Sequence, residues 1–157
     1  MIDEDGYRLN VGIIVFNDAG QLLWAKRRFG HDAWQFPQGG IREGETAVAA
    51  MYRELEEELG LKPEAVAIVA ESKEWHCYDL PLRFLRKNTP RLCIGQRQRW
   101  FLLKMNVGDE QVELCQSPRP EFKDWCWVAY WHPVEGVIDF KKQVYHDVLT
   151  EFESYMS

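Results

Sequence analysis

Residues 39–61, GGIREGETAVAAMYRELEEELGL, place the strongest constraint on the fold, because they predict a helix that ends in a cluster of carboxylates. Thr46 can cap the helix through its hydroxyl group, no Gly or Pro interrupts residues 47–59, and Gly60 is typical of the residue that ends a helix. The expected apolar face consists of Val48, Met51, Tyr52, Leu55 and Leu59. The segment therefore predicts an amphipathic helix over residues 47–59 that packs on a core.

The last turns of this helix carry carboxylates that repel one another. Glu54, Glu57 and Glu58 fall within roughly 100° of arc beside the apolar face, whereas Glu56 points elsewhere. Each acid near a helix C-terminus is disfavoured by about 0.3–1 kcal/mol. Two interpretations are open: a solvated acidic face, or a site for hard divalent cations, which take oxygen ligands and relieve the repulsion.

The composition is that of one folded domain. The chain has 157 residues, of which 46% are hydrophobic and 13% aromatic, so a packed core is expected over residues 1–157. No apolar run approaches the ~18 residues of a membrane span, and the acidic N-terminus lacks the apolar core of a signal peptide. The four cysteines form no C-x-x-C pair and the histidines show no zinc-ligand spacing. We expect a cytoplasmic protein without a zinc site.

The charge is unevenly distributed. A net charge of −6 argues against a general nucleic-acid binder. Residues 80–108, however, contain no Asp or Glu and hold seven of the 19 basic residues, which leaves 12 basic and 25 acidic residues elsewhere. A basic surface beside an acidic site would suit a polyanion held partly by metal, and a solvated strand and loop is an equally good interpretation.

The remaining chain reads mainly as strands. Strands are expected at residues 10–16, 21–28, 92–105 and 125–131, with one or two more within 65–78. Residues 34–40 are expected to form a short strand that ends in a Pro/Gly loop. A second amphipathic helix is expected at residues 140–155, with Val144, Val148, Leu149 and Phe152 on one face. Two helices and many strands favour an α/β sandwich with a mixed sheet between helices.

The spacing of residues 39–61 resembles the Nudix box. That pattern is Gly, five residues, Glu, seven residues, then Arg-Glu-aliphatic-any-Glu-Glu-any-Gly-aliphatic. Every specified position matches: Gly39, Glu45, Arg53, Glu54, Leu55, Glu57, Glu58, Gly60 and Leu61. Nine matched positions over 23 residues make this a specific signal.

The resemblance implies a Nudix-type α/β/α sandwich that hydrolyses a nucleoside diphosphate linked to another group. Mg²⁺ is the implied cofactor, and Mn²⁺ or another divalent cation can substitute. By position, Glu54, Glu57 and Glu58 would be metal ligands and Gly39 would offer its backbone carbonyl. Glu45 and Arg53 would pair and brace the loop against the helix.

This chemistry explains why a chain keeps clustered carboxylates. Phosphoanhydride hydrolysis needs charge neutralised on phosphate oxygens and an activated water, and metal ions serve both needs. A nearby carboxylate can accept the proton from that water. Glu57, Glu58 or a carboxylate from elsewhere in the chain are the candidates.

The resemblance extends beyond the box. The segments DGYRLNVGI, WQFPQGGI, MYREL, CIGQRQRWFLL, PEF and DFKK are similar to those of the Nudix enzymes that remove pyrophosphate from the 5′ end of bacterial RNA. This similarity implies that Glu121, in PEF, is a further metal ligand and a possible base. The implied substrate-binding residues are Arg8, Arg28, Tyr78, Gln96, Phe140 and Lys141.

Two departures from that pattern affect these assignments. The chain reads KRRFG where those enzymes commonly read RRFG, so Arg27 is an alternative to Arg28. Asp139 replaces a small polar residue beside Phe140 and leaves the base preference open.

Three other functions are consistent with parts of the pattern. The box is shared with enzymes that cleave dinucleoside polyphosphates such as diadenosine tetraphosphate. A non-catalytic Nudix module is disfavoured because all three carboxylates of the box are present. A solvated acidic helix on an unrelated domain is disfavoured by the nine matched positions. We expect a monomer that acts on a triphosphorylated or diphosphorylated RNA end.

Overall fold

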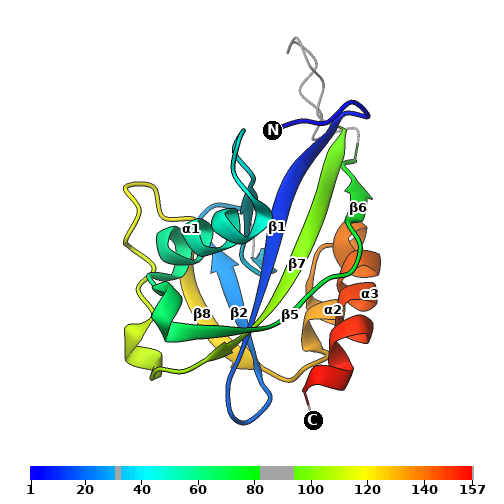
Figure 1. The fold of residues 1–157 in the computed structure, drawn as a ribbon. Coiled ribbons are helices and arrows are strands. Elements are labelled where there is room, and N and C mark those ends of the chain that lie inside the picture. The colour runs from blue at the N-terminus through cyan, green and yellow to red at the C-terminus, as the bar shows by residue number, and fades with distance from the viewer. Residues whose placement is uncertain (31–32, 82–93, 157) are drawn as a thin grey trace.

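The computed structural model describes residues 1–30, 33–81 and 94–156. Its strands are β1 (Tyr7–Phe16), β2 (Leu22–Arg27), β3 (Trp34–Gln35), β4 (Gln38–Gly40), β5 (Val66–Glu71), β6 (His76–Asp79), β7 (Gly95–Met105) and β8 (Phe122–Val128). Its α-helices are α1 (Ala47–Leu59), α2 (His132–Gly136) and α3 (Lys142–Phe152). Helix α1 lies on one side of the strands and α2 and α3 lie on the other (Figure 1). The expected α/β sandwich with a mixed sheet is confirmed.

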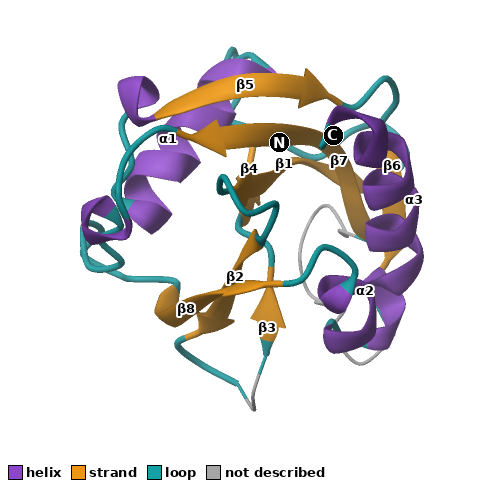
Figure 2. Ribbon diagram, turned by 90° about the horizontal axis from the view of Figure 1, so that it is seen from below, coloured by secondary structure: helices purple, strands orange, loops and turns teal. Residues whose placement is uncertain are grey.

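Strands β1 and β7 form the centre of the sheet. They pair in parallel along their length, from Tyr7 opposite Gly95 to Phe16 opposite Lys104. The other pairings are antiparallel: β2 and β4 on β1, β5 and β6 on β7, and β3 and β8 on β2. Figure 2 shows this mixed sheet with α1 and α3 at its two faces. Because β4 pairs with the middle of β1, it holds the loop that begins the Glu-rich segment beside α1.

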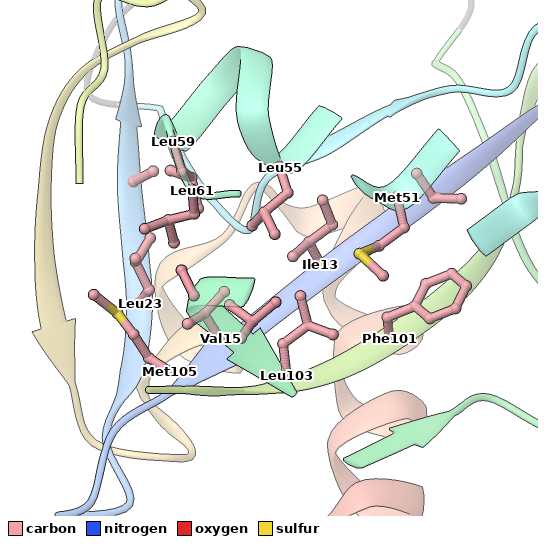
Figure 3. Close-up of a cluster of buried hydrophobic side chains, with 14 of the residues drawn as sticks. Ile13, Val15, Leu23, Met51, Leu55, Leu59, Leu61, Phe101, Leu103 and Met105 are labelled. Atoms are coloured by element: carbon pink, nitrogen blue, oxygen red, sulfur yellow. The ribbon is translucent and has the colours of Figure 1, made fainter. Parts of the chain in front are cut away.

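Helix α1 begins and ends where the sequence predicts. The Thr46 hydroxyl accepts a hydrogen bond from the Ala49 N–H at 3.1 Å, and Gly60 ends the helix in the left-handed conformation at φ 68°. Figure 3 shows Met51, Leu55 and Leu59 packed on the central strands. Full burial of each such side chain contributes about 1.5–3 kcal/mol, so α1 is held firmly on the sheet.

The roll of α1 about its axis differs from the prediction. Val48 was expected on the apolar face but is 38% exposed, whereas Glu54 is only 9% exposed. The small Ala50 is fully buried instead, so the helix presents Glu54 rather than Val48 to the interior. This roll turns the carboxylate stripe inward.

A second core covers the opposite face of the sheet. Val144, Val148, Leu149 and Phe152 are buried on α3, as predicted. Tyr145 joins them, and its hydroxyl accepts a hydrogen bond from the Phe36 N–H at 3.0 Å. This bond ties the loop between β3 and β4 to α3.

Several element boundaries were predicted wrongly. The strand expected at residues 10–16 begins at Tyr7, and the loop expected to end the strand at residues 34–40 contains β4. The strand expected at residues 125–131 runs from Phe122 to Val128, because the chain turns at residues 130–131 and Pro133 opens α2. The helix expected at 140–155 is α-helical from Lys142 to Phe152, with single 3₁₀ turns at Asp139–Lys141 and Glu153–Tyr155. The predicted Pro-rich loop lies largely within residues 82–93, outside the described residues. No described helix is long and apolar enough to cross a membrane.

Candidate active site and metal centre

A cavity of about 800 Å³ is lined by α1 and by the segment that leads into α3. Residues of β3, β4, β6 and β7 line it as well. One wall is acidic and comes from α1 and Glu121, whereas the other carries aromatic rings and a buried lysine. We call these the acidic wall (Glu54, Glu57, Glu58 and Glu121) and the aromatic wall (Tyr78, Phe140 and Lys141).

Three carboxylates of α1 form most of the acidic wall. Glu54, Glu57 and Glu58 each place one oxygen within 4.8 Å of the other two. Their spacing of three and four residues puts them on adjacent turns of one helix face. Burial raises the pKa of Glu54, an effect that the Arg53 guanidinium opposes. Carboxylates held this close and partly out of water favour a positively charged partner.

Glu121, which lies just before β8, is the one residue of the acidic wall that does not come from α1. Its backbone N–H lies close enough to the Glu58 carboxylate to favour the charged form. Burial, followed by the charges of Glu54 and Glu121, raises the pKa of Glu58 to about 7. Among the described residues, the buried Oε2 atom of Glu58 has no hydrogen-bond partner. This oxygen is available to a ligand in the cavity.

Arg53 ties the loop that precedes α1 to the acidic wall. Its Nε donates to Glu45 Oε2 at 2.9 Å, its Nη2 to the Gly40 carbonyl at 2.7 Å and its Nη1 to Glu54 Oε1 at 2.7 Å. The Arg53 guanidinium, followed by the Arg42 N–H, lowers the pKa of Glu45 to about 2. Arg53 and Glu45 therefore make the ion pair that the resemblance implies, and the same guanidinium orients Glu54.

Gly39 lies directly against the acidic wall. A Cβ atom at this position would overlap the Glu54 carboxyl group. The absence of a side chain lets the backbone of β4 approach the carboxylates closely. Sequence alone places Gly39 in the motif, and this contact explains why the position requires glycine.

The acidic wall fits a hard divalent cation. All its side-chain donors are carboxylate oxygens, the ligands that such ions prefer, and one of them is buried without a partner among the described residues. Glu54, Glu57 and Glu58 are the side chains that would hold the ion, whereas Glu121 is not part of this close group and its role as a ligand stays a prediction. A bound cation neutralises phosphate oxygens and makes water more acidic.

The aromatic wall pairs two rings with a buried cation. The ring centroids of Tyr78 and Phe140 lie 5.6 Å apart at 45°. The Nζ of Lys141 lies 5.7 Å from the Tyr78 centroid and 6.0 Å from the Phe140 centroid, and it donates to Gln35 Oε1 at 3.2 Å. Burial, followed by the charge of Arg27, lowers the pKa of Lys141 to about 8. Rings beside a cation suit a nucleotide base and its phosphates.

Arg27, and not Arg28, lines the cavity. Its Nε lies 3.6 Å from Glu121 Oε1. Leu23 and Ala25 face the core beneath α1, and the alternation of β2 continues that face to Arg27. Arg28 uses its backbone N–H to bond the Glu121 carbonyl at 2.8 Å, and its side chain is exposed. Of the two arginines, Arg27 therefore stands beside the acidic wall.

Arg8 and Gln96 differ in their relation to the cavity. Arg8 is exposed, lies near Gly40 and does not line the cavity. Gln96 does line it, and its buried Oε1 has no hydrogen-bond partner within the described chain. The two residues are register partners across β1 and β7, so Arg8 lies near the cavity without lining it.

Comparison with known proteins identifies the family. The model of the NUDIX domain matches residues 6–149. The chain belongs to the Nudix family. It is 54% identical over 155 residues to the RNA pyrophosphohydrolase of Pseudoalteromonas translucida, with 99% of this chain and 90% of the relative covered. The same identity holds over 152 residues for the RNA pyrophosphohydrolase of Shewanella denitrificans, with 97% and 88% covered.

Solved Nudix-like structures share the fold at low identity. The Escherichia coli dihydroneopterin triphosphate pyrophosphohydrolase has a TM-score of 0.72 at 18% identity, with 92% of this chain and 98% of that chain covered. The Caenorhabditis elegans Ap4A hydrolase binary complex has a TM-score of 0.65 at 19% identity, with 94% and 97% covered. These two likenesses concern the fold alone.

The Nudix cavity also contains residues that the sequence reasoning missed. Trp34, Gln38 and Ile138 line it but were not singled out. Gln38 directly precedes the motif glycine, and that position is the one signal that would have pointed to it. Trp34 opens the similar segment WQFPQGGI but was given no role, and Ile138 carries no such signal; only the tertiary fold shows that both reach the cavity.

The basic surface expected from residues 80–108 is largely neutralised where the structure describes it. Arg97 pairs with Asp3, Lys104 pairs with Asp18, and Arg99 donates to the carbonyls of Ser72 and Lys73. None of the three basic residues lines the Nudix cavity. The four other basic residues of the window, Arg83, Arg86, Lys87 and Arg91, lie outside the described residues.

Proposed function

We propose that this protein removes pyrophosphate from the triphosphorylated 5′ end of RNA and leaves a 5′-monophosphate. It also accepts diphosphorylated ends, and the product is the end that opens a transcript to decay. The observation that carries the proposal is the 54% identity, over 97–99% of the chain, to proteins named RNA pyrophosphohydrolase. The two walls of the cavity supply the chemistry that such a substrate needs.

The two walls divide the substrate between them. The acidic wall would hold Mg²⁺, for which Mn²⁺ can substitute, and the ion would neutralise charge on the triphosphate. Lys141 and Arg27 contact phosphate oxygens, and the rings of Tyr78 and Phe140 stack on the first base. One carboxylate of the acidic wall takes the proton from the attacking water. Glu57, Glu58 and Glu121 are the three candidates.

We also propose how the protein acts in the cell. The whole chain, residues 1–157, functions as one Nudix domain, as a monomer and in the cytoplasm. The family match over residues 6–149 supports a single domain. Analytical ultracentrifugation of the purified protein tests whether it is a monomer, because a dimer would give about twice the molecular mass of one chain.

The direct test uses RNA labelled at its 5′ γ-phosphate, incubated with Mg²⁺ and either wild-type protein or Glu57→Gln. Labelled pyrophosphate from the wild type, with turnover reduced by about a hundredfold or more in Glu57→Gln, is expected. Labelled orthophosphate would mean stepwise removal of phosphates. Intact RNA with both proteins, or equal turnover by both, would overturn the proposal.

A dinucleoside polyphosphate is the second candidate substrate. The aromatic wall supports it, because a pair of rings can stack on an adenine of either substrate. Stacking therefore does not distinguish an RNA end from a dinucleoside polyphosphate. Competition decides between the two: diadenosine tetraphosphate should inhibit RNA hydrolysis only weakly if RNA is the substrate. Inhibition with preferential cleavage of diadenosine tetraphosphate would favour the second candidate.

A further inference from the structure

A chain of amide side chains leads from the buried Gln98 and Asn10, through the half-buried Gln38, to the aromatic wall. Gln98, on β7, is 0% exposed. Its Nε2 donates to Asn10 Oδ1 on β1 at 2.8 Å and to Gln38 Oε1 on β4 at 3.2 Å. The Nε2 of Gln38 in turn donates to the Tyr78 hydroxyl on β6 at 3.3 Å. Four strands are therefore linked by three hydrogen bonds, and the last one ends on the cavity.

Gln98 determines which way the Gln38 amide points. An amide nitrogen can only donate, so Gln98 Nε2 requires an oxygen from Gln38. This fixes Gln38 with Oε1 toward Gln98 and Nε2 toward Tyr78, and Tyr78 Oη then acts as acceptor. Asn10 takes the other N–H of the Gln98 amide, so both N–H groups of Gln98 are used.

Glutamine at this position carries a cost in stability. The Oε1 atom of Gln98 is buried and has no hydrogen-bond partner among the described residues. A buried, unpaired carbonyl is destabilising and offsets part of what the two hydrogen bonds donated by Gln98 contribute to the fold. The adjacent core is apolar, since the Trp100 ring covers Gly12 on the same face of the sheet.

We propose that Gln98 is a positioning residue for the substrate, acting through Gln38 on Tyr78. This inference rests on the proposed function, because it assigns the aromatic wall to the 5′-terminal nucleotide. The relay (Asn10, Gln98, Gln38 and Tyr78) holds the Tyr78 ring at its angle to Phe140 and beneath Lys141. The relay also includes Gln38, the neighbour of Gly39, which lies against Glu54. The aromatic wall and the acidic wall are therefore connected through β4.

The test compares Gln98→Met, which keeps the length and removes both donors, with wild type. A matched control is Gln143→Met, which removes an exposed glutamine whose Nε2 donates to Asp147 on α3. KM for 5′-triphosphorylated RNA is expected to rise about tenfold in Gln98→Met, with kcat changed less than about twofold. Gln143→Met is expected to match the wild type. A fall in kcat at unchanged KM, or equal kinetics in all three proteins, would overturn the proposal.

A double-mutant cycle separates positioning from a general loss of packing. If the relay acts through the Tyr78 hydroxyl, Gln98→Met should have little further effect in a Tyr78→Phe background. Additive effects would refute the relay. Gln38→Met interrupts the same relay of hydrogen bonds nearer the cavity and is expected to raise KM in the same way. This second variant tests the proposal if Gln98→Met fails to fold.

If the protein does not hydrolyse RNA, the relay can still be tested separately. If wild-type protein does not cleave RNA, the same variants are compared for adenosine triphosphate affinity by calorimetry with Mg²⁺. Weaker binding by Gln98→Met than by Gln143→Met would then support the relay although RNA is not the substrate. Equal affinities, or no binding by any of the proteins, would overturn the relay as well.

Discussion

Replacing Gly39 with alanine is expected to inactivate the enzyme while its fold persists. The added Cβ would overlap the carboxyl end of Glu54. Those atoms are the far end of a flexible side chain, so rotation of Glu54 relieves the overlap at small cost to the fold. The same rotation removes the Glu54 oxygen from its position beside Glu57 and Glu58.

The size of the effect follows from the geometry. Ordinary van der Waals contact requires at least 3.4 Å, so Glu54 must move by more than about 1 Å. A misplacement of this size costs about a hundredfold in rate, or about 2.7 kcal/mol of transition-state stabilisation. The unfolding free energy should fall by only about 1 kcal/mol, since Arg53 loses Glu54 but keeps Glu45 and the Gly40 carbonyl.

The adjacent glycine supplies the control. A Cβ at Gly40 would meet only the Arg8 side chain, at 3.8 Å, so Gly40→Ala should leave activity within about threefold of wild type. The assays are kcat/KM for pyrophosphate release from 5′-triphosphorylated RNA and urea unfolding. Equal activity of Gly39→Ala and Gly40→Ala would refute the reasoning. Unfolding of Gly39→Ala would show that the loss came from the fold.

Three further predictions concern the charges and rings of the cavity. Without divalent cations, the melting temperature should fall as pH rises from 4.5 to about 7, because the folded protein holds the Glu58 proton more tightly than the unfolded chain does. Mg²⁺ should reduce this fall and Glu58→Gln should abolish it, whereas a melting temperature independent of pH would contradict the raised pKa. Arg27→Ala should raise KM for RNA about tenfold and Arg28→Ala less than about threefold, and steady-state kinetics showing the reverse order would reject Arg27 as the phosphate contact. Phe140→Ala should raise KM about 5- to 100-fold at nearly constant kcat, and a loss confined to kcat would exclude stacking on the base.

The sequence predicted the helix of the acidic wall well because its determinants are local. Thr46 caps α1 and Gly60 ends it through contacts within one turn, and the positions of Glu57 and Glu58 follow from helical periodicity. The inward roll that buries Glu54 and exposes Val48 was not predicted. It depends on how α1 packs against β1 and β4, and periodicity within the helix carries no information about that packing.

The aromatic wall shows the opposite case. Tyr78 and Phe140 are 62 residues apart, and their contact exists only because β6 joins the sheet beside the segment that leads into α3. The resemblance named both residues, but it could not supply their geometry or the relay that ends on Tyr78. Gln98 was missed because a glutamine in a strand is normally solvent-facing.

The sequence by itself determined the family, the α/β class and the identity of the carboxylates on α1, because those properties reside in short-range spacing. Only the tertiary structure decided that Arg27 rather than Arg28 enters the cavity. Alternation along β2 puts Arg27 on the same face as Leu23 and Ala25, and the pairing of β2 with β8 brings Glu121 beside it. Which side chain Arg27 meets depends on how β2 pairs with a strand almost a hundred residues away, which local sequence does not specify.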